Sequence, residues 1–108
     1  MFNKGDIIKV SIIRKMYFEI NHFGVYDGNG GVYHFTGESI PSARIQHSSL
    51  TEFEDGGTSY KENILYRKFN ADEIITRARN ELGSDFGGYN LITNNCEHFA
   101  YWCVTTGS

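Results

Sequence analysis

The sequence contains no apolar run close to the roughly 20 residues needed to cross a bilayer. Residues 1–6 also lack the apolar segment that directs secretion. Basic residues are few, because 10 Lys and Arg face 13 Asp and Glu and the formal net charge is −3. A phosphate backbone would therefore meet no general cationic field on this protein. We expect a cytoplasmic protein that has no transmembrane segment and does not bind nucleic acid.

Cysteine is scarce, with only Cys96 and Cys103 present. In one helix their Cα atoms would lie about 10.5 Å apart, beyond the ~7 Å limit for a disulfide. The sequence has no C-x-x-C pair, so a structural zinc site is disfavoured. We expect two free thiols, no metal and no other cofactor.

The length and the apolar content suit one folded domain. The chain has 108 residues, of which 40% are hydrophobic and 15% aromatic. A chain of this size builds one core rather than two, and this composition is not that of a disordered segment. We therefore expect a single domain over residues 1–108.

The first half of the chain reads mainly as strands. Residues 6–13 are rich in β-branched side chains, and residues 21–27 and 31–36 flank Gly28-Asn29-Gly30, which suits a tight hairpin turn. Residues 37–59 contain the only proline and show no sustained period, which indicates a long loop with one short strand near 43–46. Residues 63–69 read as a further strand.

Two helices are expected in the second half. Asn70 and Glu73 form a capping-box pattern, followed by apolar positions from Ile74 to Leu82 and by Gly83 as a C-terminal cap. Residues 84–91 read as a loop. A second helix should begin after a cap within Thr93-Asn94-Asn95 and end near residue 104 or 105. The pattern predicts an α+β fold in which a small antiparallel sheet packs against two helices.

Cys96 stands at the expected start of the last helix, where backbone N–H groups favour negative charge. That position favours a thiolate, although a buried cysteine often serves only as a small apolar side chain. Cys96 and Cys103 share the helix face expected to pack on the sheet. His98 lies about 200° around the helix from Cys96, so it is badly placed as a base. Cys103, deeper along the same face, is expected to be core.

His22 and His34 lie on the two strands of the expected hairpin. An odd number of loop residues would place both side chains on one face of the sheet, whereas an even number would separate them. A nucleophilic thiol needs a base and a third group that orients it. We assign Cys96 as nucleophile, His22 as base and His34 as orienting residue. Gly24, beside His22, is expected to leave open space for a substrate.

The residues that carry these assignments resemble those of the lecithin:retinol acyltransferase-like family, which includes small phospholipase A/acyltransferases. The resemblance runs in order from Gly5 to Gly107. It rests on Gly5-Asp6-Ile7-Ile8, His22-Phe23-Gly24-Val25-Tyr26, Val32-Tyr33-His34 and, most specifically, Asn95-Cys96-Glu97-His98-Phe99. It implies a circularly permuted papain-like fold and the same roles for Cys96, His22 and His34.

The resemblance also implies an acyl transfer reaction through a thioester on cysteine, with a phospholipid acyl ester as the favoured substrate and an alcohol, an amine or water as acceptor. We expect the backbone N–H of Cys96 to stabilise the oxyanion, with Tyr26 as a second donor. We expect no membrane anchor after Val104. Lys9, Arg14 and Lys15 are the cluster expected to meet anionic headgroups in a peripheral contact.

Two other functions remain open from the sequence. The first is a cysteine amidase or peptidase of the same fold, acting on a peptide-like substrate. The second is a non-catalytic binding module, which predicts a thiol of ordinary pKa without a pocket beside it. An exposed apolar surface around the long loop would favour lipid, and a polar groove would favour peptide. The oligomeric state is not predicted.

Overall fold

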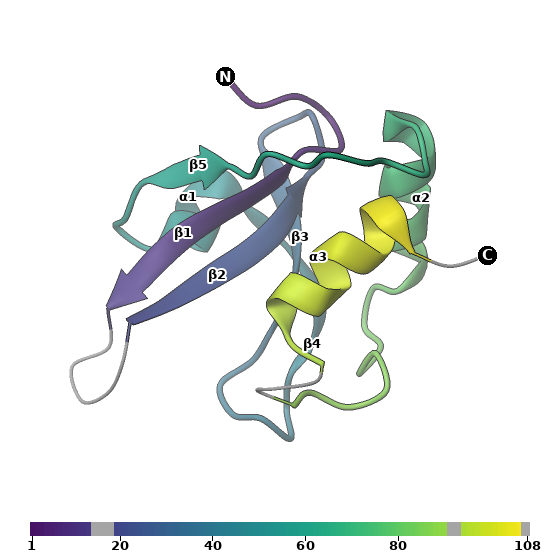
Figure 1. Cartoon of the computed structure of the whole chain (residues 1–108). Coiled ribbons are helices and arrows are strands. Elements are labelled where there is room, and N and C mark those ends of the chain that lie inside the picture. Colours follow the sequence, from purple (N-terminus) through teal and green to yellow (C-terminus); the bar gives the residue numbers. More distant parts are fainter. Residues whose placement is uncertain (14–18, 91–93, 107–108) are drawn as a thin grey trace.

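The computed structural model describes residues 1–13, 19–90 and 94–106. A five-stranded antiparallel sheet with strand order β4-β3-β2-β1-β5 carries helices on both faces, which confirms the predicted α+β class. Figure 1 shows α3 lying alongside β2 and β3, with α2 next to α3. The elements are β1 (Ile7–Ile13), β2 (Glu19–Tyr26), β3 (Gly31–Thr36), β4 (Arg44–Ser49), α1 (Leu50–Glu54), β5 (Ser59–Lys61), α2 (Ala71–Asn80) and α3 (Cys96–Thr105).

The sheet divides between β2 and β3 into two parts, which we call wings. One wing consists of β5, β1 and β2, and the other consists of β3 and β4. β2 pairs with β1 along seven positions, and β3 pairs with β4 along all six of its residues. Between the wings only Val25↔Tyr33 and Tyr26↔Val32 are paired. Beyond these pairs the backbone of β2 faces a gap instead of a neighbouring strand, and the first turn of α3 enters this gap.

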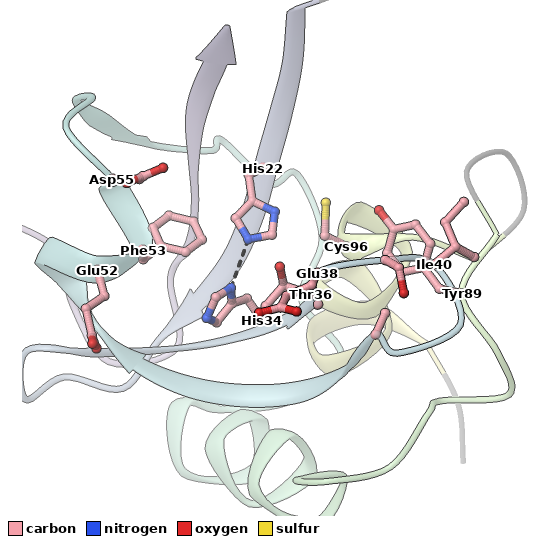
Figure 2. Close-up of a pocket in the computed structure, with 13 residues that line it drawn as sticks. His22, His34, Thr36, Glu38, Ile40, Glu52, Phe53, Asp55, Tyr89 and Cys96 are labelled. Atoms are coloured by element: carbon pink, nitrogen blue, oxygen red, sulfur yellow. Dashed lines mark hydrogen bonds between the residues drawn. The ribbon is translucent and has the colours of Figure 1, made fainter. Parts of the chain in front are cut away.

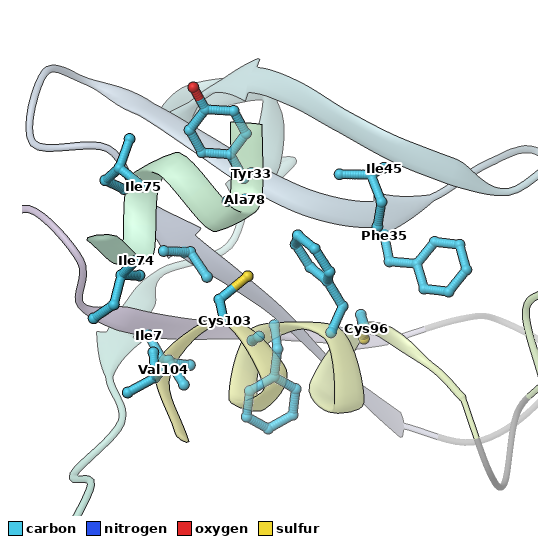
Figure 3. Packing of buried hydrophobic residues seen from close by; sticks show 14 of the residues in the cluster. Ile7, Tyr33, Phe35, Ile45, Ile74, Ile75, Ala78, Cys96, Cys103 and Val104 are labelled. Atoms are coloured by element: carbon cyan, nitrogen blue, oxygen red, sulfur yellow. The ribbon is translucent and has the colours of Figure 1, made fainter. Parts of the chain in front are cut away.

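The two faces of the sheet have separate cores. The larger core lies under α2 and α3, where Phe35, Ile74 and Val104 are buried together (Figure 3). The smaller core lies on the opposite face, where Phe53 of α1 covers Val32 and Tyr26. Alternation along β2 assigns odd-numbered residues to the first core and even-numbered ones to the second. His22 is even-numbered, so its side chain points to the α1 face.

The hairpin turn between β2 and β3 has an odd-numbered loop, one of the two alternatives that the sequence left open. Asp27 N–H donates to the carbonyl of Gly31 at 2.9 Å, which leaves residues 28–30 as the loop. Gly28 and Gly30 have φ of +84° and +85°, a conformation that glycine adopts without steric cost. His22 and His34 therefore lie on one face, as the odd-loop alternative requires.

The expectation of a long loop over residues 37–59 was wrong in part. β4 is longer than the short strand expected, and α1 follows it directly. Ser49 and Glu52 form a capping box at the start of α1, so the signal was present in the sequence. β4 is hard to recognise because it is an edge strand in which only Ile45 is apolar.

The strand expected over residues 63–69 was also wrong. The strand at this edge is β5, which pairs with β1 only at Ile8, Lys9 and Val10. The chain then leaves the sheet, and Lys68 N–H donates to the carbonyl of Val104 in α3. The β-prone residues misled the prediction because Leu65 and Tyr66 project into solvent instead of packing.

The predicted helices are confirmed, with small corrections at their ends. Asn70 and Glu73 form the capping box of α2, and Asn95 caps α3, whereas Thr93 lies outside the described residues. α2 ends at Asn80, so Leu82 lies beyond it and is 44% exposed. The C-terminal cap of α2 is Glu81 and not Gly83 as expected. No helix among the described residues is long and apolar enough to cross a membrane.

Arg77 of α2 holds the far end of α3. Its guanidinium lies between the rings of Phe69 and Trp102, at 4.1 and 3.9 Å from their centroids. It also donates hydrogen bonds to the carbonyls of Trp102 and Cys103 at 2.7 and 3.2 Å. A cation at a helix C-terminus is favourable, so Arg77 anchors α3 and thereby its first residue, Cys96.

Candidate active site

A pocket of about 350 Å³ opens where the two wings of the sheet separate. Figure 2 shows Cys96, His22 and His34 together in this pocket. They come from α3, β2 and β3, three elements that meet at the gap. The pocket is lined by His22, His34, Thr36, Gly37, Glu38, Ser39, Ile40, Ala43, Glu52, Phe53, Asp55, Tyr89 and Cys96.

Cys96 is the first residue of α3, and its thiol fills the gap beside β2. The Sγ atom donates to the carbonyl of Asn21 at 3.8 Å, and the N–H of Phe23 lies in hydrogen-bonding range of the sulfur. Both are β2 backbone groups on the side where β3 has separated. The gap therefore lets a helix on one face of the sheet bring its sulfur to histidines on the other face.

The pKa of Cys96 differs from the sequence-based prediction. Burial raises the pKa of the thiol, while the N–H groups of Phe23, Glu97 and Cys96 act in the opposite direction. The helix N-terminus was expected to favour the thiolate, but Cys96 is only 5% exposed, and the loss of solvent around its thiol outweighs the effect of the helix. The raised pKa favours the protonated form of the Cys96 thiol.

His22 and His34 form a hydrogen-bonded pair. The Nε2 atom of His22 lies 2.8 Å from the Nδ1 atom of His34, and the Nε2 atom of His34 lies 2.8 Å from the Oγ atom of Ser48. Figure 2 shows the other ring nitrogen of His22 on the side of the ring that faces Cys96. The three side chains of His22, His34 and Ser48 form a chain of polar contacts that ends next to the thiol.

Phe53 of α1 holds both histidines in place. Its ring stacks on His22 and meets His34 edge-on, with centroids 5.1 and 5.4 Å apart. His34 is only 6% exposed, and burial, followed by the neighbouring charges of His22 and His47, lowers its pKa to about 3. His34 is therefore neutral at physiological pH and carries a single ring proton.

The open space expected beside Gly24 is filled. A Cβ atom at this position would lie 2.4 Å from Cγ1 of Val32 and 2.9 Å from Cε1 of Phe53. Gly24 therefore allows Val32 and Phe53 to pack closely against β2, and the prediction of a substrate channel at this position was wrong. The pocket extends past the histidines from Phe53 to Tyr89 and Ile40.

The structure does not bring Tyr26 to the site. Its phenol oxygen accepts the N–H of Gly30 at 3.0 Å in the hairpin turn, and Tyr26 does not line the pocket. Tyr89, from the loop before α3, has its phenol in hydrogen-bonding range of both the backbone N–H and the thiol of Cys96. Burial and the neighbouring Cys96 raise the pKa of Tyr89 to about 12, so it keeps its proton.

At the start of α3, the N–H of Cys96 lies beside the pocket within reach of Tyr89. The side chain of Asn95 accepts the N–H groups of Glu97 and His98 at 3.0 and 3.2 Å. The Cys96 N–H is one of the helix N–H groups without an intrahelical acceptor, and it points toward the Tyr89 phenol. An N–H donor beside a nucleophile is the arrangement that stabilises an oxyanion.

The remaining histidines lie outside the pocket. The imidazole of His98 bonds to the Oδ1 atom of its own helix cap, Asn95, at 2.8 Å, in agreement with the expectation that it does not serve Cys96. His47 lies on β4 rather than in a loop and bonds to Asp27 at 2.8 Å. Cys103 is fully buried and, like Cys96, is a free thiol.

The pocket wall carries three carboxylates, from Glu38, Glu52 and Asp55. Hydrogen bonds from the backbone N–H and the hydroxyl of Ser49 lower the pKa of Glu52, which keeps it ionised. No Lys or Arg lines the described part of the pocket. In the cluster expected to meet anionic headgroups, Lys9 pairs with Glu62 at 3.1 Å, and Arg14 and Lys15 lie outside the described residues.

Ser48 and Tyr89 are the two site residues that the sequence reasoning missed. A serine in a polar edge strand carries no distinguishing signal, because its partner on β3 becomes evident only from the register. Tyr89 lies in a loop whose path depends on Asn94, which donates to the carbonyls of Phe86 and Gly88 at 2.7 and 2.9 Å. Such a path cannot be read from hydrophobic periodicity.

Comparison with known proteins agrees with this geometry. The family described as lecithin retinol acyltransferase matches residues 1–108, which is the whole chain. A search of curated proteins found no match. Across the described residues, no three His, Cys, Asp or Glu side chains are grouped so as to hold a metal ion. By the match along its full length, this chain belongs to the lecithin retinol acyltransferase family.

Proposed function

We propose that this protein is a thiol-dependent acyltransferase or hydrolase that carries the acyl group as a thioester on Cys96. The observation that supports this most strongly is the meeting of Cys96, His22 and Tyr89 in one pocket, with His34 bonded behind His22. A sulfur, a neutral imidazole and two donors for an oxyanion are the groups that acyl transfer requires. Family membership supports the same class of reaction.

The first half of the reaction acylates the sulfur. The proton of the Cys96 thiol passes to the Nδ1 atom of His22, because Nε2 is engaged by His34. The sulfur attacks the acyl carbonyl carbon, and the carbonyl oxygen becomes an oxyanion held by the Cys96 N–H and the Tyr89 hydroxyl. The tetrahedral intermediate collapses, the ester C–O bond breaks, and His22 gives its proton to the departing alkoxide.

The second half releases the acyl group. An acceptor that is water, an alcohol or an amine gives its proton to Nδ1 of His22 and attacks the thioester carbonyl. The C–S bond breaks, the thiolate takes the proton back from His22, and the acyl group leaves on the acceptor. Neutral His34 accepts the Nε2–H of the His22 imidazolium in both halves, which keeps the ring oriented.

The favoured substrate is a phospholipid acyl ester whose head group is neutral or zwitterionic. The three wall carboxylates Glu38, Glu52 and Asp55 disfavour an anionic head group near the sulfur. The exposed side chain of Ile40 is the apolar part of the rim that an acyl chain can contact. We also propose that residues 1–108 act as one catalytic domain without a cofactor.

A cysteine amidase or peptidase is the second candidate. The polar part of the wall, formed by Thr36, Ser39 and the three carboxylates, suits a peptide-like substrate with a basic side chain. Cys96 and His22 would have the same roles in both reactions, because an amide and an ester of the same acyl group differ only in the leaving group. Comparing an acyl ester with an acyl amide of the same chain length separates the two candidates.

The test of the proposed function is the intact mass of the protein after exposure to an activated short-chain acyl ester. Wild type and Cys103→Ala should each gain one acyl group, since the buried Cys103 takes no part. Cys96→Ser and His22→Ala should gain none in the same time. A non-catalytic binding module would show no adduct in wild type, and an adduct that persists in Cys96→Ser would place the chemistry elsewhere.

A further inference from the structure

Ser48 lies at the end of the hydrogen-bonded chain that runs from His22 through His34. It belongs to β4 and pairs with Val32 of β3, which points into the core on the α1 face. Its half-buried hydroxyl lies 2.8 Å from the Nε2 atom of His34. Ser48 does not line the pocket, so it can act on the chemistry only through His34.

The position of one proton on His34 decides whether His22 can act as a base. Neutral His34 carries its proton on either Nδ1 or Nε2. With the proton on Nδ1, His34 donates to Nε2 of His22, and neutral His22 must then carry its own proton on Nδ1, where it cannot accept another. With the proton on Nε2, His34 accepts from Nε2–H of His22, and Nδ1 of His22 is left to take the thiol proton.

Protonation of His22 leaves His34 with one possible tautomer. When His22 becomes an imidazolium, both of its nitrogens carry protons, so its Nε2–H must donate to Nδ1 of His34. The single proton of His34 must then lie on Nε2, where the Ser48 oxygen is the group in contact. Without this oxygen, a buried N–H would lack an acceptor at the moment of proton transfer, which is costly.

We propose that Ser48 is a positioning residue that accepts the Nε2–H of His34 and so fixes the tautomer that makes His22 a base. The kinetic part of this assignment rests on the proposed function, and the tautomer part does not. Among the described residues, the hydrogen bond to His34 links Ser48 to the pocket. The ionisable groups around the histidine pair are Cys96 of α3, Tyr89 of the preceding loop, His47 of β4, and Glu38, Glu52 and Asp55 at the pocket wall.

The test compares Ser48→Thr with Ser48→Val, two side chains of nearly equal shape that differ in the hydroxyl. The first readout is the protonated nitrogen of His34, from long-range ¹H–¹⁵N NMR of labelled protein at neutral pH. Wild type and Ser48→Thr should carry the proton on Nε2, and Ser48→Val should carry it on Nδ1. Equal unfolding temperatures of the two variants confirm that the comparison is between folded proteins.

The second readout is steady-state turnover of the acyl ester. Ser48→Val should lower kcat about tenfold with KM little changed, because an unmet buried donor costs about this factor. The acid limb of the kcat–pH profile of this variant should move to lower pH, because the imidazolium form of His22 is less well stabilised. Ser48→Thr should restore both properties. A purely structural role for Ser48 would raise KM or lower stability without moving the acid limb.

The two readouts separate the failure of this assignment from the failure of the proposed function. If wild type and Ser48→Val show the same His34 tautomer, or wild type carries the proton on Nδ1, the assignment to Ser48 is wrong whatever the activity. If the tautomer moves as expected but kcat of the two variants is equal, Ser48 does not position the base. If no protein turns over any ester while the tautomer still depends on Ser48, only the proposed function has failed.

Discussion

The Nε2 atom of His22 lies 2.8 Å from the Nδ1 atom of His34, across strands whose backbones are no longer paired at that point. The bond joins the two wings of the sheet by side chains where the ladder of backbone hydrogen bonds has ended. The same separation admits the first turn of α3, so the split in the sheet both creates the pocket and brings the sulfur to the imidazole. Changes that close the split should therefore affect catalysis and folding together.

Replacing Tyr89 by phenylalanine should lower kcat and leave KM nearly unchanged. The change removes only the phenol oxygen next to the N–H and thiol of Cys96, and the ring still meets Phe35 at 4.8 Å. Loss of one oxyanion donor costs about 10²-fold or more in kcat, and less where another donor remains. Steady-state kinetics with a short-chain ester measure this effect. A kcat equal to that of wild type would exclude Tyr89 from the reaction, and Tyr26→Phe, away from the pocket, is the matched control.

Stability should fall as pH drops below the ordinary pKa of histidine, partly because of His34. Its pKa is 6.5 when exposed and about 3 in the fold, so the unfolded chain binds a proton between these values and the folded protein does not. By linkage the free energy of unfolding decreases as pH falls through this window, by about 1.5 kcal/mol from pH 6.5 to pH 5.

The His34 contribution is measured by urea unfolding of wild type and His34→Gln at several pH values. The carboxylates contribute equally to both proteins, so the difference between the two curves isolates His34. The wild-type curve should be steeper between pH 6.5 and pH 5. Parallel curves over that interval would show that His34 is not buried as a neutral imidazole.

Gly24→Ala should destabilise the fold by about 1–3 kcal/mol through overpacking. The added methyl group would lie 2.4 Å from Val32 and 2.9 Å from Phe53, the residue that stacks on His22. Denaturant unfolding gives the loss, and activity should fall as Phe53 is displaced. The double variant Gly24→Ala/Val32→Ala should recover part of both losses. If the destabilisation of the double variant equals the sum of those of the two single variants, the methyl group at position 24 does not contact Val32 directly.

The charge of the pocket wall should make the enzyme prefer cationic over anionic substrates. A thiocholine ester and an ester of a carboxylated thiol, with the same acyl group, provide a matched pair. We expect kcat/KM to favour the thiocholine ester roughly tenfold at low salt, with the preference reduced by added salt. The variant Glu38→Gln/Glu52→Gln/Asp55→Asn should lose most of the preference. A preference as large as that of wild type in this variant would show that other residues determine the selectivity.

Local signals explain the parts of the fold that the sequence predicts well. The hairpin followed from the turn glycines, and α2 and α3 followed from their asparagine caps and apolar stripes. These features depend on residues close together in the chain. The prediction failed at Ile64 and Leu65, whose β-prone side chains lie in a segment that bonds to α3 instead of the sheet.

The candidate site was predictable in its residues but not in its electrostatics. Cys96, His22 and His34 could be chosen from their types and positions, and all three line one pocket. The direction of the Cys96 pKa could not be predicted, because it depends on how deeply the sulfur is buried between the wings. Tyr89 and Ser48 reach the site through a loop path and a strand register, which are properties of the assembled fold.

The most direct test of the account is the alkylation rate of Cys96 by iodoacetamide, measured against pH in a Cys103→Ala background with and without His22→Ala. Burial raises the pKa of the thiol, so without the imidazole the sulfur should react more slowly near neutral pH than an ordinary peptide thiol. With His22 present it should react faster than without it, because the imidazole can take the thiol proton. Equal rates with and without His22 would show that the sulfur and the imidazole do not share a proton, and the enzymatic account would then be wrong.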